Sequence, residues 1–134
     1  MQTVYIAGPM SWYPDFNFPA FIEAAFDLRE QGYVVYNPVE FDQPEEVEEH
    51  SKEQGLGTAS PMWRRFLARD LEIVLTKVDA VVVLPDWARS VGATLEVTAA
   101  LAAQKKVYSY ADGMVELPLE SPIPMWFYAP ELFV

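Results

Sequence analysis

The chain has 134 residues, a formal net charge of −11 and no cysteine. A chain of this length usually forms one domain, and the absence of cysteine excludes disulfides and thiolate chemistry. The acidic balance excludes a surface that binds polymeric nucleic acid through its phosphates. No apolar run approaches the ~20 residues of a membrane span, and the first residues lack the features of a signal peptide. We therefore expect a cytoplasmic protein with a single domain over residues 1–134 and no membrane contact.

The first part of the chain predicts a strand, a helix and a second strand. The run at 3–8 is short, rich in β-forming residues and ends at a Gly-Pro pair, as is typical of a buried strand before a turn. Apolar residues then recur at helical spacing until Gly32, which stands where a helix C-cap belongs. The expected apolar stripe of this helix is Phe18, Phe21, Ile22, Ala25 and Leu28. A second strand follows at 33–38.

An acidic segment comes next, within an expected loop at 40–60. Residues 40–53 hold seven acidic residues against one lysine. We interpret this segment as a solvated, mobile loop. Two more specific alternatives are a lid over an active site and a surface that binds a partner. We expect its histidine, His50, to be solvated as well.

The remaining elements complete the alternation of strands and helices. Ser60 and Pro61 begin a helix in the usual order of cap and proline. The uninterrupted apolar run at 79–86 is expected of a central parallel strand covered on both faces. A helix at 92–104 and a strand at 106–110 follow. A tail follows at 111–134, and its stretch at 121–134 is rich in proline and aromatic residues and either adds an edge strand or packs across a neighbouring subunit.

This order predicts an α/β fold. Alternating strands and helices form a parallel sheet of four or five strands, with helices on both faces, in a single flavodoxin-like or Rossmann-like domain. Ligands of such sheets bind beyond the carboxyl ends of the strands. Polar residues after the first and third strands should therefore converge at one edge of the sheet. The expected substrate-binding residues are Gly8, Pro9, Met10, Ser11, Asp86, Trp87, Arg89, Ser90 and Gly92.

Two carboxylates are expected at the same edge. Glu96 lies near the start of an alanine-rich helix, and Asp70 shares a helical stripe with apolar residues, so it points with the apolar face. Each has a simpler interpretation: Glu96 stabilises the positive end of a helix dipole, and Asp70 forms an ion pair with Arg65 or Arg69. One histidine and no cysteine make a zinc site improbable. The chain also lacks the Gly-x-Gly-x-x-Gly and P-loop patterns, and we expect no cofactor.

Several segments of the sequence resemble those of a known family. They are "YIAGPM…NFPAFIEAAFDLREQGYVVYNPVE", "W..FLARDL", "DAVVVLPDWARSVGATLE" and "A.AAQKKV". They resemble a family of small phage and bacterial proteins (DUF4406-like), which is similar to the nucleoside 2-deoxyribosyltransferases and the nucleotide N-glycoside hydrolases. The resemblance spans roughly residues 3–110, and its most specific part is the spacing of Ser90, Gly92 and Glu96.

The resemblance implies a catalytic role for three residues. Glu96 matches the nucleophile that attacks the anomeric carbon of the sugar, Asp70 matches an aspartate that holds sugar and base groups, and Tyr5 matches a tyrosine that positions the nucleophile. Ser90 stands where the monophosphate hydrolases have serine and the transferases have aspartate. The hydrolases also carry a phosphate-gripping arginine in the loop after the first strand. This chain has none there, and Arg89 or the amides of residues 8–11 would have to substitute.

The resemblance implies cleavage or exchange of the N-glycosidic bond of a nucleoside 5′-monophosphate, preferably a 2′-deoxy one, with no metal or organic cofactor. The alternatives are a nucleoside 2-deoxyribosyltransferase, an NAD or ADP-ribose glycohydrolase, a non-catalytic nucleotide-binding protein, and an interaction protein that uses the acidic segment. We also expect a homodimer or a larger homo-oligomer, because the tail gathers large apolar residues. These are Trp126, Phe127, Tyr128, Leu132 and Phe133.

Overall fold

The computed structural model describes residues 2–110 and 114–117. Its strands are β1 (Thr3–Ala7), β2 (Val34–Tyr36), β3 (Ala80–Val83), β4 (Lys106–Ser109) and β5 (Val115–Glu116). Its α-helices are α1 (Phe18–Glu30), α2 (Pro44–Glu53), α3 (Pro61–Thr76) and α4 (Val91–Ala102). Short 3-10 helices are η1 (Pro14–Asn17), η2 (Pro38–Phe41), η3 (Gln54–Ala59) and η4 (Trp87–Arg89).

The described strands form one sheet in the order β2-β1-β3-β4-β5. The first four strands are parallel, and β5 pairs with β4 in the antiparallel direction. The predicted parallel sheet is therefore confirmed for four strands, whereas the fifth reverses direction. In the register of the sheet, Tyr5 of β1 lies between Tyr36 and Val81.

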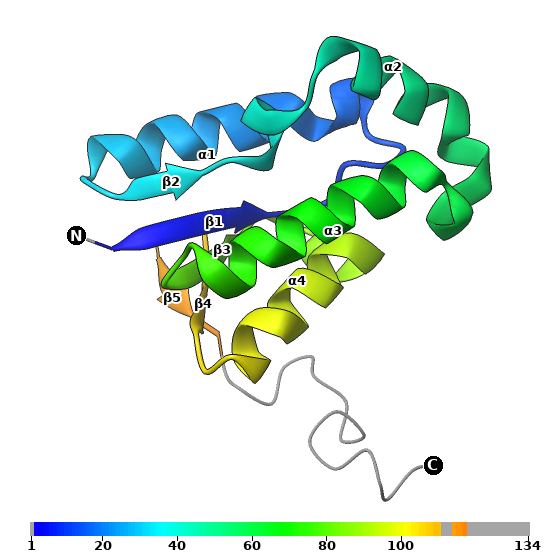
Figure 1. Cartoon of the computed structure of the whole chain (residues 1–134). Helices are drawn as coiled ribbons and strands as arrows, with labels where there is room; N and C mark the ends of the chain where they lie inside the picture. The colour runs from blue at the N-terminus through cyan, green and yellow to red at the C-terminus, as the bar shows by residue number, and fades with distance from the viewer. Residues whose placement is uncertain (1, 111–113, 118–134) are drawn as a thin grey trace, which may run out of the picture.

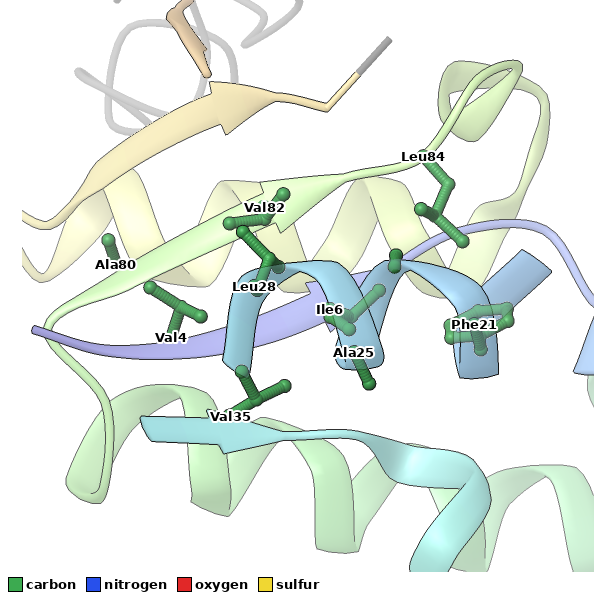
Figure 2. Close-up of a cluster of buried hydrophobic side chains, with 10 residues drawn as sticks. Val4, Ile6, Phe21, Ala25, Leu28, Val35, Ala80, Val82 and Leu84 are labelled. Carbon is green, nitrogen blue, oxygen red and sulfur yellow. The ribbon is translucent and has the colours of Figure 1, made fainter. Parts of the chain in front are cut away.

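Helices cover both faces of this sheet, as predicted (Figure 1). Side chains of a strand alternate between the two faces. Val4 and Ile6 of β1 pack against α1, together with Leu28 of that helix (Figure 2). Tyr5 and Ala7 point to the opposite face, into the cluster that contains the buried residues of α3 and α4. This alternation decides which helices the Tyr5 hydroxyl can reach.

The buried stripe of α1 differs from the predicted one at three positions: Ala24 is buried, Phe18 is only half-buried and Ile22 is exposed. The buried residues are Phe21, Ala24, Ala25 and Leu28, which follow the spacing of one helical face. Ile22 was expected on this face, but its side chain is 56% exposed. The prediction was wrong because Ile22 lies one residue, or about 100°, beyond the stripe centred on Phe21 and Ala25.

The acidic segment is ordered, and its interpretation as a mobile loop was wrong. Most of it forms α2, which begins with a capping box between Gln43 and Glu46 and carries Pro44 in its first turn. The helix packs against α3. His50, expected to be solvated, is only 7% exposed because it faces this contact. Its ring stacks on Phe16 and meets the edge of Phe66, with centroids 5.0 and 5.4 Å apart.

The carboxyl-terminal predictions lie largely outside the described residues. The aromatic residues on which the homodimer prediction depends all belong to 118–134. The oligomeric state therefore stays a prediction. Within residues 2–110 and 114–117, no helix is long and apolar enough to cross a membrane.

Candidate active site

A hollow lies at the carboxyl end of β1, between the loop after that strand and the helices α3 and α4. Its walls include Tyr5, Asp70 and Glu96, the three residues for which the sequence implied a catalytic role. We name it the inner hollow. A second hollow, the outer hollow, adjoins it and extends along the loop after β1 to η3 and the start of α4. The two share Met10, Ser11, His50, Trp63, Ser90 and Gly92.

Tyr5 and Glu96 form the shortest link in this site. The Tyr5 hydroxyl donates a hydrogen bond to Glu96 Oε2 over 2.5 Å, across 91 positions of the sequence. Both side chains are buried, with exposed fractions of 1% and 6%. The alternation of β1 sends Tyr5 toward α4, and Glu96 lies on the buried side of that helix with Ala93, Val97 and Ala100. The bond fixes the orientation of the Glu96 carboxyl group.

Asp70 is held from the other side by an arginine. Arg69 Nε donates to Asp70 Oδ1 over 2.8 Å, and its Nη1 donates to Asp42 Oδ1 over 2.8 Å. The guanidinium also lies 5.1 Å from the centre of the Phe66 ring. The alternative in which Asp70 pairs with Arg69 is thus correct, and Asp70 still lines the inner hollow. Arg69 is therefore the cationic partner of two buried carboxylates, Asp42 and Asp70. Among the described residues, no cationic side chain contacts Glu96 directly.

Burial changes the acidity of all three groups. Desolvation raises the pKa of Glu96 well above its usual range, and the nearby charge of Asp70 adds to this, against the hydrogen bond from Tyr5. Burial raises the pKa of Asp70 to about 6, although Arg69 opposes the shift. Burial and the two carboxylates also raise the pKa of Tyr5 well above its usual value, so its hydroxyl stays protonated.

This arrangement can hold one proton between two carboxyl groups. Both pKa values are shifted upward, chiefly by burial, and the charge of Asp70 adds to the shift of Glu96. In such a pair one group serves as an acid while the other serves as a base or nucleophile. Tyr5 stays a donor to Glu96 throughout. The geometry therefore suits a reaction that needs a carboxylate and a proton donor side by side.

The structure brings most of the predicted substrate-binding residues to the two hollows. Of the residues predicted on this site, the inner hollow is lined by Gly8, Met10, Ser11, Ser90 and Gly92, and Pro9 and Arg89 line the outer hollow. Asp86 and Trp87 line neither. Asp86 is exposed at the left-handed turn before η4, and Trp87 packs against the hydrophobic cluster under α3 and α4. Both residues lie at the start of η4, three and four residues after the end of β3, and neither reaches a hollow.

Some residues that line the site also determine the local backbone structure. Ser90 Oγ caps α4 by accepting a hydrogen bond from the Ala93 amide over 3.1 Å, which leaves its own hydrogen to donate elsewhere. At Gly8 an added Cβ would lie 3.0 Å from the Leu84 side chain, so glycine allows the loop to pass close to the end of β3. At Gly92 the nearest atoms would be 3.9 Å away, and a side chain there would simply fill the hollow.

Sequence reasoning missed several residues of the site. His50, Trp63 and Phe66 line the inner hollow, and Asp42 shares the arginine that holds Asp70. Trp63 and Phe66 belong to the helical stripe that Asp70 shares with apolar residues, so the sequence pattern could have identified them. His50 and Asp42 lie within the acidic run at 40–53, whose composition is typical of an exposed segment, so their sequence context did not indicate burial. Among the described residues no group of three histidine or acidic side chains is arranged to hold a metal ion.

A family model described as "Domain of unknown function (DUF4406)" matches residues 2–109. None of the curated proteins compared with the chain matches it. The matched residues include every side chain of both hollows described above. The family part of the resemblance is confirmed, and the relation to nucleoside deoxyribosyltransferases stays a prediction.

Proposed function

The chain belongs to the DUF4406 family, and we propose that it is an enzyme that cleaves the N-glycosidic bond of a nucleoside 5′-monophosphate through Glu96. The observation that carries the proposal is the buried arrangement of Tyr5, Glu96 and Asp70 at one edge of the sheet. Burying two carboxyl groups beside a fixed phenol costs stability, and buried ionisable groups with shifted pKa values are typical of functional sites.

The fold supports this location for a nucleotide site. The order β2-β1-β3-β4-β5 is that of flavodoxin-like sheets, in which the ligand lies at the switch between β1 and β3. The loop after β1 and the segment after β3 both line the two hollows. We therefore assign the chain to a flavodoxin-like arrangement, with its ligand at this switch.

The proposed reaction uses the two carboxyl groups in turn. As the bond between C1′ and the base breaks, positive charge grows on the sugar, and the Glu96 carboxylate captures C1′ as a glycosyl ester. In the reactive form of the pair the single shared proton lies on Asp70 while Glu96 is ionised, and Asp70 gives that proton to the departing base nitrogen. Water then attacks C1′, Asp70 takes back one proton, and the Glu96 carboxylate leaves. Tyr5 donates to Glu96 and keeps one carboxylate oxygen away from the sugar, so that the other is presented to C1′.

The walls of the hollows suit the other parts of the substrate. Phe21, Pro38 and Phe66 give the inner hollow an apolar side against which a base can lie. Ser90 stands at the junction with the outer hollow, where its remaining hydrogen can reach a 5′-phosphate, and Arg89 adds a positive charge nearby. Exchange of the base shares the first step and differs only in that a second base, instead of water, attacks C1′.

The test is to incubate the protein with nucleosides, their 5′-monophosphates and NAD, and to look for free base by chromatography. A matched Glu72→Gln variant changes an exposed glutamate on α3 and should keep full activity. Glu96→Gln should remove activity. Release of a base by Glu96→Gln as fast as by the unchanged protein would contradict the proposal.

A further inference from the structure

The outer hollow is larger than a phosphate requires. Its cavity volume is about 390 Å³, against about 70 Å³ for the inner hollow. Beyond the residues shared by both, it is lined by Trp12, Tyr13, Gln54, Thr58, Arg89 and Val91, among others. A nucleoside with C1′ at Glu96 and its 5′-phosphate at Ser90 would leave this outer part free.

The two hollows differ in charge. The inner hollow carries the carboxyl groups of Asp70 and Glu96. Of the described residues that line the outer hollow, none is acidic, and Arg89 supplies a positive charge. This is unusual in a chain with a net charge of −11. The outer hollow is therefore suited to an anionic group, whereas the inner hollow stabilises a cationic one.

The outer hollow also presents aromatic faces to solvent. The Trp12 side chain is 75% exposed, and Tyr13 beside it is partly exposed. The backbone of Trp12 has a φ of 69°, in the left-handed region that bulky residues avoid. It is held there by a hydrogen bond from its amide to Gln54 Oε1 over 3.1 Å, and Asn17 Nδ2 ties the same loop to the Pro9 carbonyl over 2.9 Å. A strained, exposed tryptophan at the rim of a pocket points to a ligand that stacks on it.

We propose that the outer hollow binds the second half of a dinucleotide whose two nucleosides are joined 5′ to 5′ through a pyrophosphate. This rests on the proposed function, because C1′ of the first nucleoside is taken to lie at Glu96. The pyrophosphate passes Ser90 toward Arg89, and the second base stacks on Trp12. The substrate class would then be dinucleotides in preference to mononucleotides.

The experiment compares each 2′-deoxynucleoside 5′-monophosphate with the symmetrical 5′–5′ pyrophosphate dinucleotide that contains two copies of it. We expect kcat/KM for base release to be ~10-fold higher for the dinucleotide than for the monophosphate, because stacking of one base on an aromatic side chain accounts for a factor of this size. Two equivalent bonds alone would give only a factor of about two. Trp12→Ala should reduce the preference to about that statistical factor, and Trp12→Phe should retain most of it. Phe26→Ala, which removes an exposed aromatic residue of α1 outside both hollows, should leave the preference unchanged.

Binding is measured as well, by calorimetry on the Glu96→Gln variant and on Glu96→Gln combined with Trp12→Ala. Tighter binding of the dinucleotide than of the monophosphate, lost with Trp12, supports the outer site even if no base is released from any compound. In that case only the proposed function fails. Equal binding of the two ligands, unchanged by Trp12→Ala, overturns the outer-site proposal whatever the turnover.

Discussion

Two sets of acidic residues in this chain have opposite environments. Asp42, Asp70 and Glu96 are buried or nearly so, and a single arginine lies between the first two. The acids of α2, such as Glu45 and Glu48, are exposed to solvent. Asp70 and Glu96 lie outside the dense acidic run at 40–53, whereas the second set, like Asp42, belongs to it. Charge density along the chain therefore marks the surface helix, and burial of isolated carboxylates marks the site.

The largest effect should come from the most buried member of the first set. Glu96→Gln keeps the shape of the side chain but cannot attack C1′, so we expect kcat/KM to fall by more than ~10³-fold. The melting temperature should stay level or rise, because a buried ionisable group is replaced by a neutral one. Base release followed by chromatography, with thermal unfolding on the same preparation, checks both. A strong loss of stability would instead assign Glu96 a structural role.

Asp70→Asn separates the catalytic interpretation of this aspartate from the ion-pair interpretation. If Asp70 supplies the proton for the departing base, its loss should lower kcat/KM by ~10² to 10⁴-fold. The folded protein should remain, because Arg69 keeps its bond to Asp42. Activity is measured per folded molecule, with unfolding followed by circular dichroism. Unchanged activity with a lowered melting temperature would show that the ion pair is all that Asp70 provides.

Ser90→Asp tests whether the junction of the two hollows accepts a phosphate. Aspartate is as good a helix N-cap as serine, so α4 should still form. Its charge would repel a 5′-phosphate, and the ratio of kcat/KM for nucleotide over nucleoside should fall by ~10- to 100-fold. Ser90→Asn, which caps the helix without the charge, is the matched control. An unmoved ratio would mean that no phosphate is bound at Ser90.

The raised pKa of Asp70 should make both activity and stability depend on pH. Its folded-state pKa is about 6, against an unfolded value near 3.8, so the folded protein binds this proton more tightly. The resulting stability is fully present below the unfolded value and is lost as the pH rises through about 6. Activity should rise over the same range, as the pair with Glu96 gives up the first of its two protons, and fall when the second is lost at higher pH.

Unfolding by urea between pH 4 and pH 8 checks the stability effect. In Asp70→Asn the fall in stability through about pH 6 should be smaller than in the unchanged protein. An identical pH dependence in both proteins would contradict the assignment. The acid limb of kcat/KM is measured on the unchanged protein alone.

The parts of the fold that follow from local patterns were predictable, and those that depend on packing were not. The order of the strands, the cap at Ser60 and the alternation of β1 are local signals, although β2 and β3 are shorter than predicted. The role of Tyr5 beside Glu96 was implied by the family resemblance alone. The burial of His50 depends on how α2 packs against α3. The glutamates around it in the sequence indicate an exposed segment instead. The pairing of Asp42 with Arg69 joins positions 27 apart and has no local signature. Asp86 was misplaced because the turn after β3 could not be read from its residues.

The smallest effect should come from the exposed acids of α2. Glu45 and Glu48 lie outside both hollows, and Glu48 reaches only Lys52 at 3.6 Å on its own helix. The double substitution Glu45→Gln and Glu48→Gln should cost less than ~1 kcal/mol in unfolding free energy, the usual contribution of a dipole contact and an exposed ion pair. It should leave kcat/KM within about twofold, since neither residue touches the site and the lost charges are screened at ~0.15 M salt. Urea unfolding and base release measure the two quantities. A tenfold loss of activity in a fully folded variant would mean that the exposed acids act on the substrate or on a partner. That result would contradict the claim that only the buried set of acids contributes to activity.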